Sequence, residues 1–188
     1  MQENPHRIPP TDEELVQLTL QEERRFRSLI ERYETKLTRY IRRISSLSED
    51  DVKDVLQETF IKVYRNLNEF DQTLKFSSWI YRIVHNETIN VLRKANHFPR
   101  ALHNEEDNED IEQFAGTFDL EEEIFKKMEG EKVREAIASL EEKYRNVLIL
   151  KFLEEKSYEE ISDIIKRPIG TVGTLINRAK QQLREKLK

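Results

Sequence analysis

The sequence contains no cysteine and few of the residues that break helices or build tight turns. Its 188 residues include 4 glycines and 5 prolines. The absence of cysteine excludes disulfides and thiolate metal sites. The shortage of glycine and proline favours helices over turn-rich sheets. We therefore expect an all-α protein of the intracellular type.

Long apolar runs are also missing. Among the longest is Val147-Leu-Ile-Leu150, far shorter than the roughly 20 residues that a helix needs to cross a bilayer. The first residues show no apolar core of a signal peptide. These features predict a cytoplasmic protein with no membrane insertion.

Charge is abundant but unevenly distributed. The formal net charge is -5, which by itself argues against a nucleic-acid-binding protein. Residues 105–123 contain ten acidic side chains and no lysine or arginine, whereas residues 166–188 contain seven basic side chains opposed only by Glu185. Because the charges are segregated, the basic C-terminal end can bind phosphate even though the net charge of the chain is negative.

The first part of the chain is strongly periodic. Thr11, followed by three acidic residues, is a good helix start. One apolar stripe runs over residues 26–44, a second over 52–67, and a third helix is expected from about 77 to 94. The second stripe is predicted to face inward: Val52, Val55, Leu56, Thr59, Phe60, Val63, Tyr64 and Leu67.

The end of the chain is typical of a helix-turn-helix. Ser157 and Glu160 have the spacing of a capping box, and Pro168 stops the first helix. The second helix can lie in a DNA major groove, although a plain helical hairpin with a solvated basic face is also open. Its inward residues are expected to be Val172, Ile176, Ala179, Leu183 and Leu187.

These patterns predict two small helical domains joined by a flexible acidic linker. The N-terminal domain would be a helical bundle, and the C-terminal one a four-helix domain that ends in the helix-turn-helix. The expected ranges are a flexible lead over 1–10, the first domain over 11–95, the linker over 96–125 and the second domain over 126–188.

Four stretches in this order resemble the extracytoplasmic-function sigma factors of bacteria. They are residues 54–67, 76–83 with Asn86, 140–150 and 157–180. The resemblance implies a dissociable RNA polymerase subunit that selects promoters and helps melt them, without enzymatic activity. It also implies core polymerase as a partner, through the largest-subunit coiled coil and the flap. Promoter DNA, duplex and single-stranded, and an anti-sigma factor are the other partners implied.

The resemblance implies three sets of site residues, and for the first of them an ordinary solvated face is the alternative. The polymerase-binding set is Asp54, Gln57, Glu58, Ile61, Lys62 and Arg65. The set for the minus-ten element is Asn68, Lys75, Ser77, Arg82, Asn86, Asn90 and Arg93. The set for the minus-thirty-five element is Arg167, Thr171, Thr174, Asn177, Arg178, Lys180 and Arg184.

Three positions depart from the family pattern. Members often carry Asp where Asn90 stands, and basic residues where Gly173 and Leu175 stand. Two interpretations of Gly173 are open. Its missing side chain allows the helix backbone to approach DNA closely, or the promoter contact at this end of the protein is simply weaker. Trp79 is expected in the core rather than stacked on a base.

Other function classes remain as alternatives. A stand-alone helix-turn-helix regulator would use the same C-terminal unit, and a helical adaptor or antagonist would need no DNA. An enzyme is the least favoured class, because the chain has no glycine-rich phosphate loop and its 4 histidines lack metal-ligand spacing. We expect no catalytic residues, metal or cofactor. The resemblance implies that the acidic linker threads through the polymerase active-site cleft, and a solvated tether is the alternative. Independently of the resemblance, we expect its acidic side chains to compete with phosphate and keep the basic domains off non-specific DNA.

Overall fold

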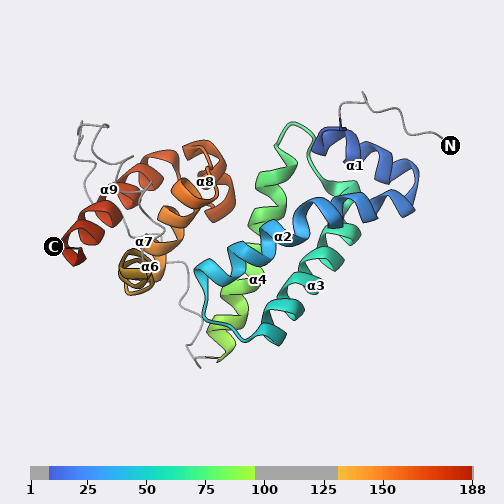
Figure 1. The fold of residues 1–188 in the computed structure, drawn as a ribbon. Helices are drawn as coiled ribbons and strands as arrows, with labels where there is room; N and C mark the ends of the chain where they lie inside the picture. The colour runs from blue at the N-terminus through green and yellow to red at the C-terminus, as the bar shows by residue number, and fades with distance from the viewer. Residues whose placement is uncertain (1–8, 96–130, 188) are drawn as a thin grey trace.

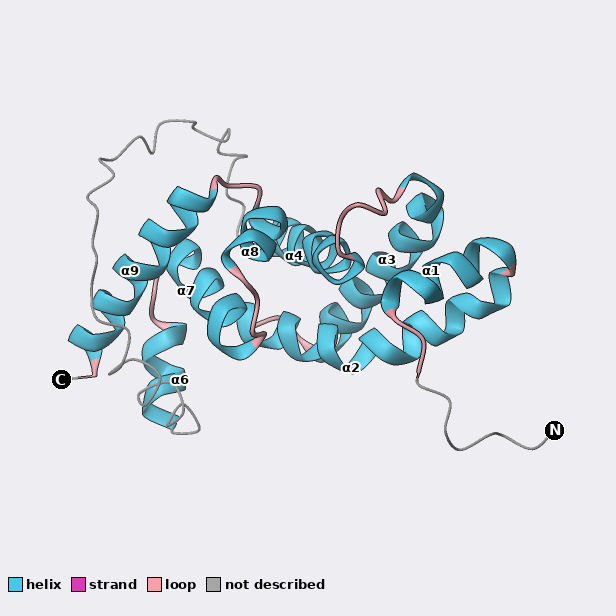
Figure 2. Ribbon diagram, turned by 90° about the horizontal axis from the view of Figure 1, so that it is seen from above, coloured by secondary structure: helices cyan, strands magenta, loops and turns pink. Residues whose placement is uncertain are grey.

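A computed structural model describes residues 9–95 and 131–187 of the chain, and Figures 1 and 2 show that their regular elements are helices. The all-α prediction is confirmed. Residues 1–8 of the expected lead over 1–10, the acidic linker over 96–125 and residues 126–130 lie outside the described residues. The N-terminal elements are α1 (Asp12–Gln21), a 3-10 turn η1 (Glu23–Arg25), α2 (Phe26–Ile44), α3 (Glu49–Asn66), a 3-10 turn η2 (Leu67–Glu69) and α4 (Phe76–Ala95).

The C-terminal elements form a second group of helices. They are α6 (Glu131–Ala138), α7 (Glu142–Leu148), a π-helical turn η3 (Ile149–Leu153), α8 (Tyr158–Ile165) and α9 (Ile169–Lys186). Figure 1 shows this group beside the bundle of α1–α4, with α8 next to α4.

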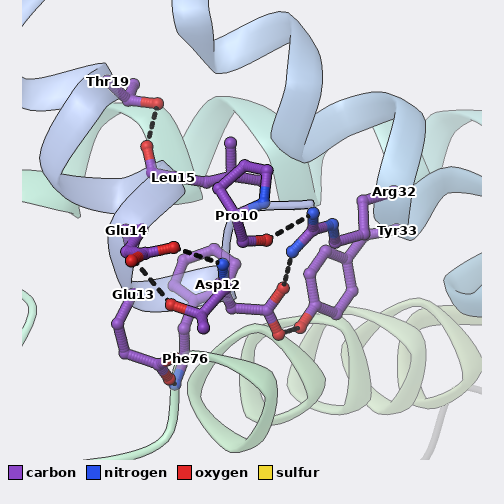
Figure 3. Close-up of polar contacts among 10 residues, drawn as sticks. Pro10, Asp12, Glu13, Glu14, Leu15, Thr19, Arg32, Tyr33 and Phe76 are labelled. Carbon is purple, nitrogen blue, oxygen red and sulfur yellow. Dashed lines mark hydrogen bonds and ion pairs between the residues drawn. The ribbon is translucent and has the colours of Figure 1, made fainter. Parts of the chain in front are cut away.

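The first turn of α1 fixes the N-terminal bundle. The helix begins after Thr11 as predicted, and Thr11 and Glu14 also form a capping box that the sequence reading did not include: the Glu14 N–H donates to the Thr11 hydroxyl at 3.1 Å, and the Thr11 N–H donates to the Glu14 carboxylate at 2.8 Å. Asp12 accepts hydrogen bonds from Arg32 at 2.8 Å and from Tyr33, which ties α1 to α2. Figure 3 shows these contacts around the start of α1. The carboxylate of Glu13 also accepts the backbone N–H of Phe76, so the start of α4 is held by the same turn.

An aromatic cluster supports the loop that precedes α4. The ring of Phe76 is fully buried and packs edge-on against Tyr33 and Phe70, with centroids 5.6 Å apart in each pair. Trp79 lies against both Phe70 and Phe76, at centroid distances of 5.1 Å and 5.8 Å. Trp79 therefore packs on the core as expected, although part of its ring remains accessible.

Two residues expected to face inward are exposed, and those predictions were wrong. Tyr64 is 43% exposed because it lies at the edge of the α3 stripe, where its ring rests on Phe26 at 5.2 Å and its hydroxyl reaches Glu23. Leu187 is 37% exposed because it follows the last turn of α9 as the C-cap. The remaining predicted inward residues of α9 are buried.

The helix-turn-helix forms as the capping signals predict. Ser157 and Glu160 make the capping box of α8, and Lys166 ends that helix in the left-handed region with φ of 54°. The hydroxyl of Ser162 donates to the Arg167 carbonyl at 2.6 Å and closes the turn. Pro168 then precedes α9, which packs on α7 and α8 through a stripe of buried residues. This stripe is Val172, Ile176, Ala179 and Leu183.

Candidate functional site

The first candidate surface lies on α3. Val52, Val55, Thr59, Phe60 and Val63 turn into the core, and the six residues predicted for polymerase binding lie on the remaining surface. Asp54, Gln57, Glu58 and Arg65 are exposed, while Ile61 and Lys62 are half-buried.

A groove of about 390 Å³ follows this surface where α3 meets α4. Four of the predicted residues line it, together with residues of α4 that the sequence reading did not place there. The groove is lined by Asp54, Val55, Gln57, Glu58, Ile61, Glu87, Val91 and Lys94. The apolar side chain of Ile61 between acidic neighbours gives it an amphipathic floor, which suits a protein partner.

Lys62 does not line the groove but pairs with acidic residues of both its walls. Its ammonium lies 2.7 Å from a carboxylate oxygen of Glu87 on α4 and 3.8 Å from one of Glu58 on α3. Glu87 is only 15% exposed, so this ion pair is partly withdrawn from water. Lys62 therefore holds α3 against α4, and Arg65 lies outside the groove.

The second candidate surface begins in the loop before α4. Asn68 is exposed on η2, and the loop beyond it is ordered by Asp71, which accepts hydrogen bonds from the backbone and hydroxyl of Thr73 at 2.9 Å and 2.8 Å. These hydrogen bonds lower the pKa of Asp71 below its usual value. Lys75 is exposed and Ser77 half-buried at the start of α4.

Four of the predicted minus-ten residues fall on one face of α4. Arg82, Asn86, Asn90 and Arg93 recur at helical spacing, and the last three are exposed. Amide and guanidinium groups in a row can hydrogen-bond base edges and phosphates. Ser77 lies away from this row, so the structure does not bring it together with them.

The third candidate surface is the face of α9 opposite its buried stripe. Thr171, Thr174 and Arg178 follow one line along the helix, and Asn177 and Arg184 a neighbouring one. The hydroxyl of Thr174 donates to the Gly170 carbonyl at 3.0 Å.

Two of the predicted minus-thirty-five residues lie off the main line of this face. Arg167 is half-buried in the turn before α9. Lys180 lies at the border of the face, with its ammonium 5.4 Å from the ring centroid of Phe152. Both basic side chains therefore stand apart from the face that carries Thr171 and Asn177.

Gly173 and Leu175 lie in different surroundings. A Cβ added at Gly173 would meet no atom within 4 Å, so no neighbour in this fold requires glycine there. Leu175 packs partly against the core, which accounts for an apolar residue at that position.

Two kinds of site are absent from the part of the chain that the structure describes. Among residues 9–95 and 131–187 no group of three or more histidine, aspartate or glutamate side chains is placed to hold a metal ion. Within the same ranges, no helix has the length and apolar character needed to cross a membrane.

Comparison with known proteins assigns the chain to a family. The Sigma-70 region 2 family model matches residues 29–98, and the Sigma-70, region 4 model matches residues 130–183. The ECF RNA polymerase sigma factor SigW of Bacillus subtilis (strain 168) is 32% identical over 167 residues, covering 87% of this chain and 89% of SigW. The chain belongs to the ECF sigma factors of RNA polymerase. The ECF RNA polymerase sigma-E factor of Haemophilus influenzae is 33% identical over 186 residues, covering 94% of this chain and 95% of that protein.

Solved structures show the same fold. CnrH, in complex with the cytosolic domain of CnrY, superposes with a TM-score of 0.68 at 24% identity, over 94% of this chain and 96% of CnrH. The sigma factor RpoE of Bartonella quintana, in complex with the anti-sigma factor NepR, gives a TM-score of 0.62 at 23% identity. That match covers 86% of this chain and 96% of RpoE.

Family membership settles the class of function. The chain is an RNA polymerase sigma factor that acts in transcription initiation. The region 2 match spans the α3 groove and the polar face of α4, and the region 4 match spans the helix-turn-helix. A stand-alone regulator or an adaptor would not need the region 2 part, so this match argues against both alternatives.

Proposed function

We propose that this ECF sigma factor divides its work among the three surfaces. The α3 surface with its groove docks on the coiled coil of the largest polymerase subunit. The loop over residues 67–77 and the polar face of α4 capture and read the melted minus-ten element. The outer face of α9 reads the minus-thirty-five element, and its unit also meets the flap.

The observation that carries this proposal is the groove between α3 and α4. It lies within the region 2 match, and its lining includes Gln57, Glu58 and Ile61 of the set that the sequence resemblance implies for polymerase binding. Its mixed apolar and charged lining fits a protein partner better than a nucleic acid. DNA contacts are correspondingly assigned to the arginine and asparagine residues outside it.

Further parts of the proposal follow from this assignment. Residues 11–95 act as the polymerase-docking and melting domain and residues 126–188 as the duplex-reading domain, with the acidic segment 96–125 as the connection. The chain supplies recognition but no catalysis of its own, and it works in the cytoplasm, where core polymerase meets promoters. An anti-sigma factor holds it when inactive, as NepR binds the Bartonella sigma factor.

Reconstituted transcription tests the proposal. Purified chain is added to bacterial core polymerase and a pool of genomic promoter fragments, and RNA starts are mapped with and without it. We expect new, discrete starts that depend on the chain and share a minus-ten and a minus-thirty-five sequence. Lack of such starts with the cognate core enzyme, together with tight duplex binding by the chain alone, would overturn the proposal in favour of a stand-alone regulator.

A further inference from the structure

The turn between α8 and α9 is short and carries two cations. Helix α8 ends at Ile165 and α9 begins at Ile169, so residues 166–168 alone join them, and Figure 2 shows this connection as a loop. Lys166 is exposed, whereas Arg167 is half-buried. Within residues 9–95 and 131–187, no carboxylate forms an ion pair with either side chain. The charge of Lys166 is therefore open to a ligand from outside the chain.

The backbone at Lys166 has a conformation that lysine does not favour. Its φ of 54° and ψ of 51° lie in the left-handed region, where Cβ approaches the carbonyl oxygen. Helices that end in this conformation commonly do so with glycine, which has no Cβ. Since lysine stands here instead, other contacts must hold the backbone in place.

Ser162 of α8 supplies these contacts. Its carbonyl accepts the N–H of Lys166, which is the end of the helix, and the N–H of Arg167 at 3.3 Å. Its hydroxyl donates to the carbonyl of Arg167 at 2.6 Å. The peptide groups on both sides of Arg167 are therefore tied to one residue, and the hydroxyl of Ser162 is the side-chain part of that attachment.

The α9 side of the turn is anchored separately. Pro168 has a fixed φ and disfavours helical geometry in the residue before it. The Val172 N–H donates to the Pro168 carbonyl at 3.0 Å, and the side chain of Val172 is fully buried, as are Ile161 and Ile164 of α8. The conformational freedom left in the turn lies at Lys166 and its neighbour, and it is this freedom that Ser162 restricts.

The first part of α9 carries no charge of its own. Residues 169–177 are all neutral, and the first basic residue of the helix is Arg178. Arg178 lies about 13 Å along the helix axis from Ile169, at 1.5 Å per residue. A recognition helix reads base edges mainly with its N-terminal residues, while nearby cations hold the phosphates. Of the two cations beside that end of α9, only Lys166 is exposed.

We propose that Lys166 binds a backbone phosphate of duplex DNA beside the start of α9, and that Ser162 is the positioning residue that holds Lys166 for this contact. The inference rests on the proposed function, because it deepens the duplex-reading role assigned to α9. A lysine ammonium binds phosphate as a point charge, so the contact adds affinity and fixes orientation without reading sequence. Base edges are left to neutral side chains such as Thr171 and Thr174.

Duplex binding by the full chain tests the phosphate contact. A fluorescein-labelled duplex of mixed sequence is titrated by anisotropy at several salt concentrations, since the slope of log affinity against log salt counts the phosphates neutralised. Lys166→Gln removes the charge, Lys166→Arg keeps it, and Lys132→Gln changes an exposed lysine of α6 as the matched control. We expect Lys166→Gln alone to lower the slope by about one and to weaken binding about threefold.

A double-mutant cycle tests the role of Ser162. Ser162→Ala removes the hydroxyl but leaves a better helix former, so α8 is retained, and Ser162→Thr keeps a donor. If Ser162 acts through Lys166, Ser162→Ala lowers the slope and affinity in the natural chain, has no effect on the Lys166→Gln chain, and is not mimicked by Ser162→Thr. Adding Lys166→Gly to Ser162→Ala should restore the melting temperature, because glycine accepts the left-handed backbone, without restoring DNA affinity.

Each part of the inference can fail by itself. An unchanged slope in folded Lys166→Gln, or no duplex binding by the natural chain at any salt concentration, would refute the phosphate contact. Equal losses from Ser162→Ala in the natural and Lys166→Gln chains would refute the positioning role, since Ser162 would then support the helix pair as a whole.

Failure of this inference differs from failure of the proposed function. The titration uses the free chain and a duplex of mixed sequence, whereas the transcription assay uses core polymerase and promoters. New promoter-specific starts combined with an unchanged slope in Lys166→Gln would leave the sigma function intact and remove only the Lys166 contact. A lowered slope without new starts would keep the contact and remove the promoter role.

Discussion

The hydroxyl of Tyr40 lies 3.0 Å from Nδ1 of His85, and both side chains are buried between α2 and α4. Burial, with a smaller contribution from the charge of Arg93, lowers the pKa of His85 from 6.5 to about 4. The imidazole is therefore neutral in the folded protein at neutral pH. Protonation would place an unpaired charge in the core.

This shift predicts a loss of stability in mild acid. The unfolded chain takes up a proton on His85 near its ordinary pKa, and the folded chain does so only near pH 4, so stability falls as pH drops through that window. We expect His85 to account for up to about 3 kcal/mol of unfolding free energy between pH 7 and pH 4. Urea unfolding followed by circular dichroism at a series of pH values measures it.

A variant separates His85 from the carboxylates that titrate in the same range. His85→Gln keeps a hydrogen-bonding group for Tyr40 but cannot take up a proton. Its stability should fall less steeply than that of the natural chain below pH 6.5. Parallel curves for the two proteins would contradict the assignment of this pH dependence to His85.

Docking on core polymerase is predicted to depend on the α3 groove. Gln57→Lys places a positive charge at the exposed edge of the groove, beside Glu58 and Ile61, without removing an internal ion pair. We expect affinity for core polymerase to fall about tenfold or more, as is common when charge is changed within an interface. Fluorescence anisotropy of labelled chain with core enzyme measures it.

The control for this prediction makes the same substitution elsewhere. Gln17→Lys changes an exposed residue of α1 and should leave core affinity unchanged. If Gln57→Lys binds core polymerase as tightly as the natural chain does, the groove is not the docking surface. An equal loss of affinity in both variants would assign the effect to net charge rather than to the groove.

Local signals explain why much of the fold could be predicted from the sequence. The helix start at Thr11 and the capping box of Ser157 depend on residues within one turn, and the stop at Pro168 acts on its immediate neighbours. The helix expected from about 77 to 94 is Phe76–Ala95 in the structure. Helix faces follow from spacing alone, which also placed Gln57 and Ile61 on the outer face of α3.

Contacts between distant residues could not be predicted in this way. The ion pair of Lys62 with Glu87, and hence the second wall of the groove, depends on how α3 and α4 are packed. Glu154 meets partners in α2 and α4, and no local pattern distinguishes it from the exposed Glu155 beside it. The exposure of Tyr64 is equally a matter of tertiary packing, since its spacing fits the buried stripe.

Promoter melting is predicted to require Arg82. Its guanidinium belongs to the polar face of α4 with Asn86 and Asn90, so Arg82→Ala removes one cation from the path assigned to the melted strand. We expect the rate of open-complex formation to fall about tenfold, measured as the time course of permanganate reactivity of promoter thymines. Arg27→Ala, an exposed arginine of α2 paired with Glu31, is the control and should melt the promoter normally. Normal reactivity in Arg82→Ala would remove this residue from the minus-ten surface.

The two interpretations of Gly173 are separated by adding a single methyl group. A Cβ at this position would meet no atom within 4 Å in the free protein, and the residue is not in the left-handed region. Gly173→Ala should therefore stabilise α9 by up to about 1 kcal/mol, because alanine loses less conformational entropy in a helix. Thermal unfolding measures this gain.

If the helix backbone approaches DNA closely, the stabilised variant should bind a minus-thirty-five duplex more weakly in the polymerase complex. We expect Gly173→Ala to weaken duplex binding. The surface of α9 at Gly173 has space for DNA, and no neighbour within the protein accounts for a glycine there. Unchanged duplex binding would instead assign Gly173 to a weaker promoter contact.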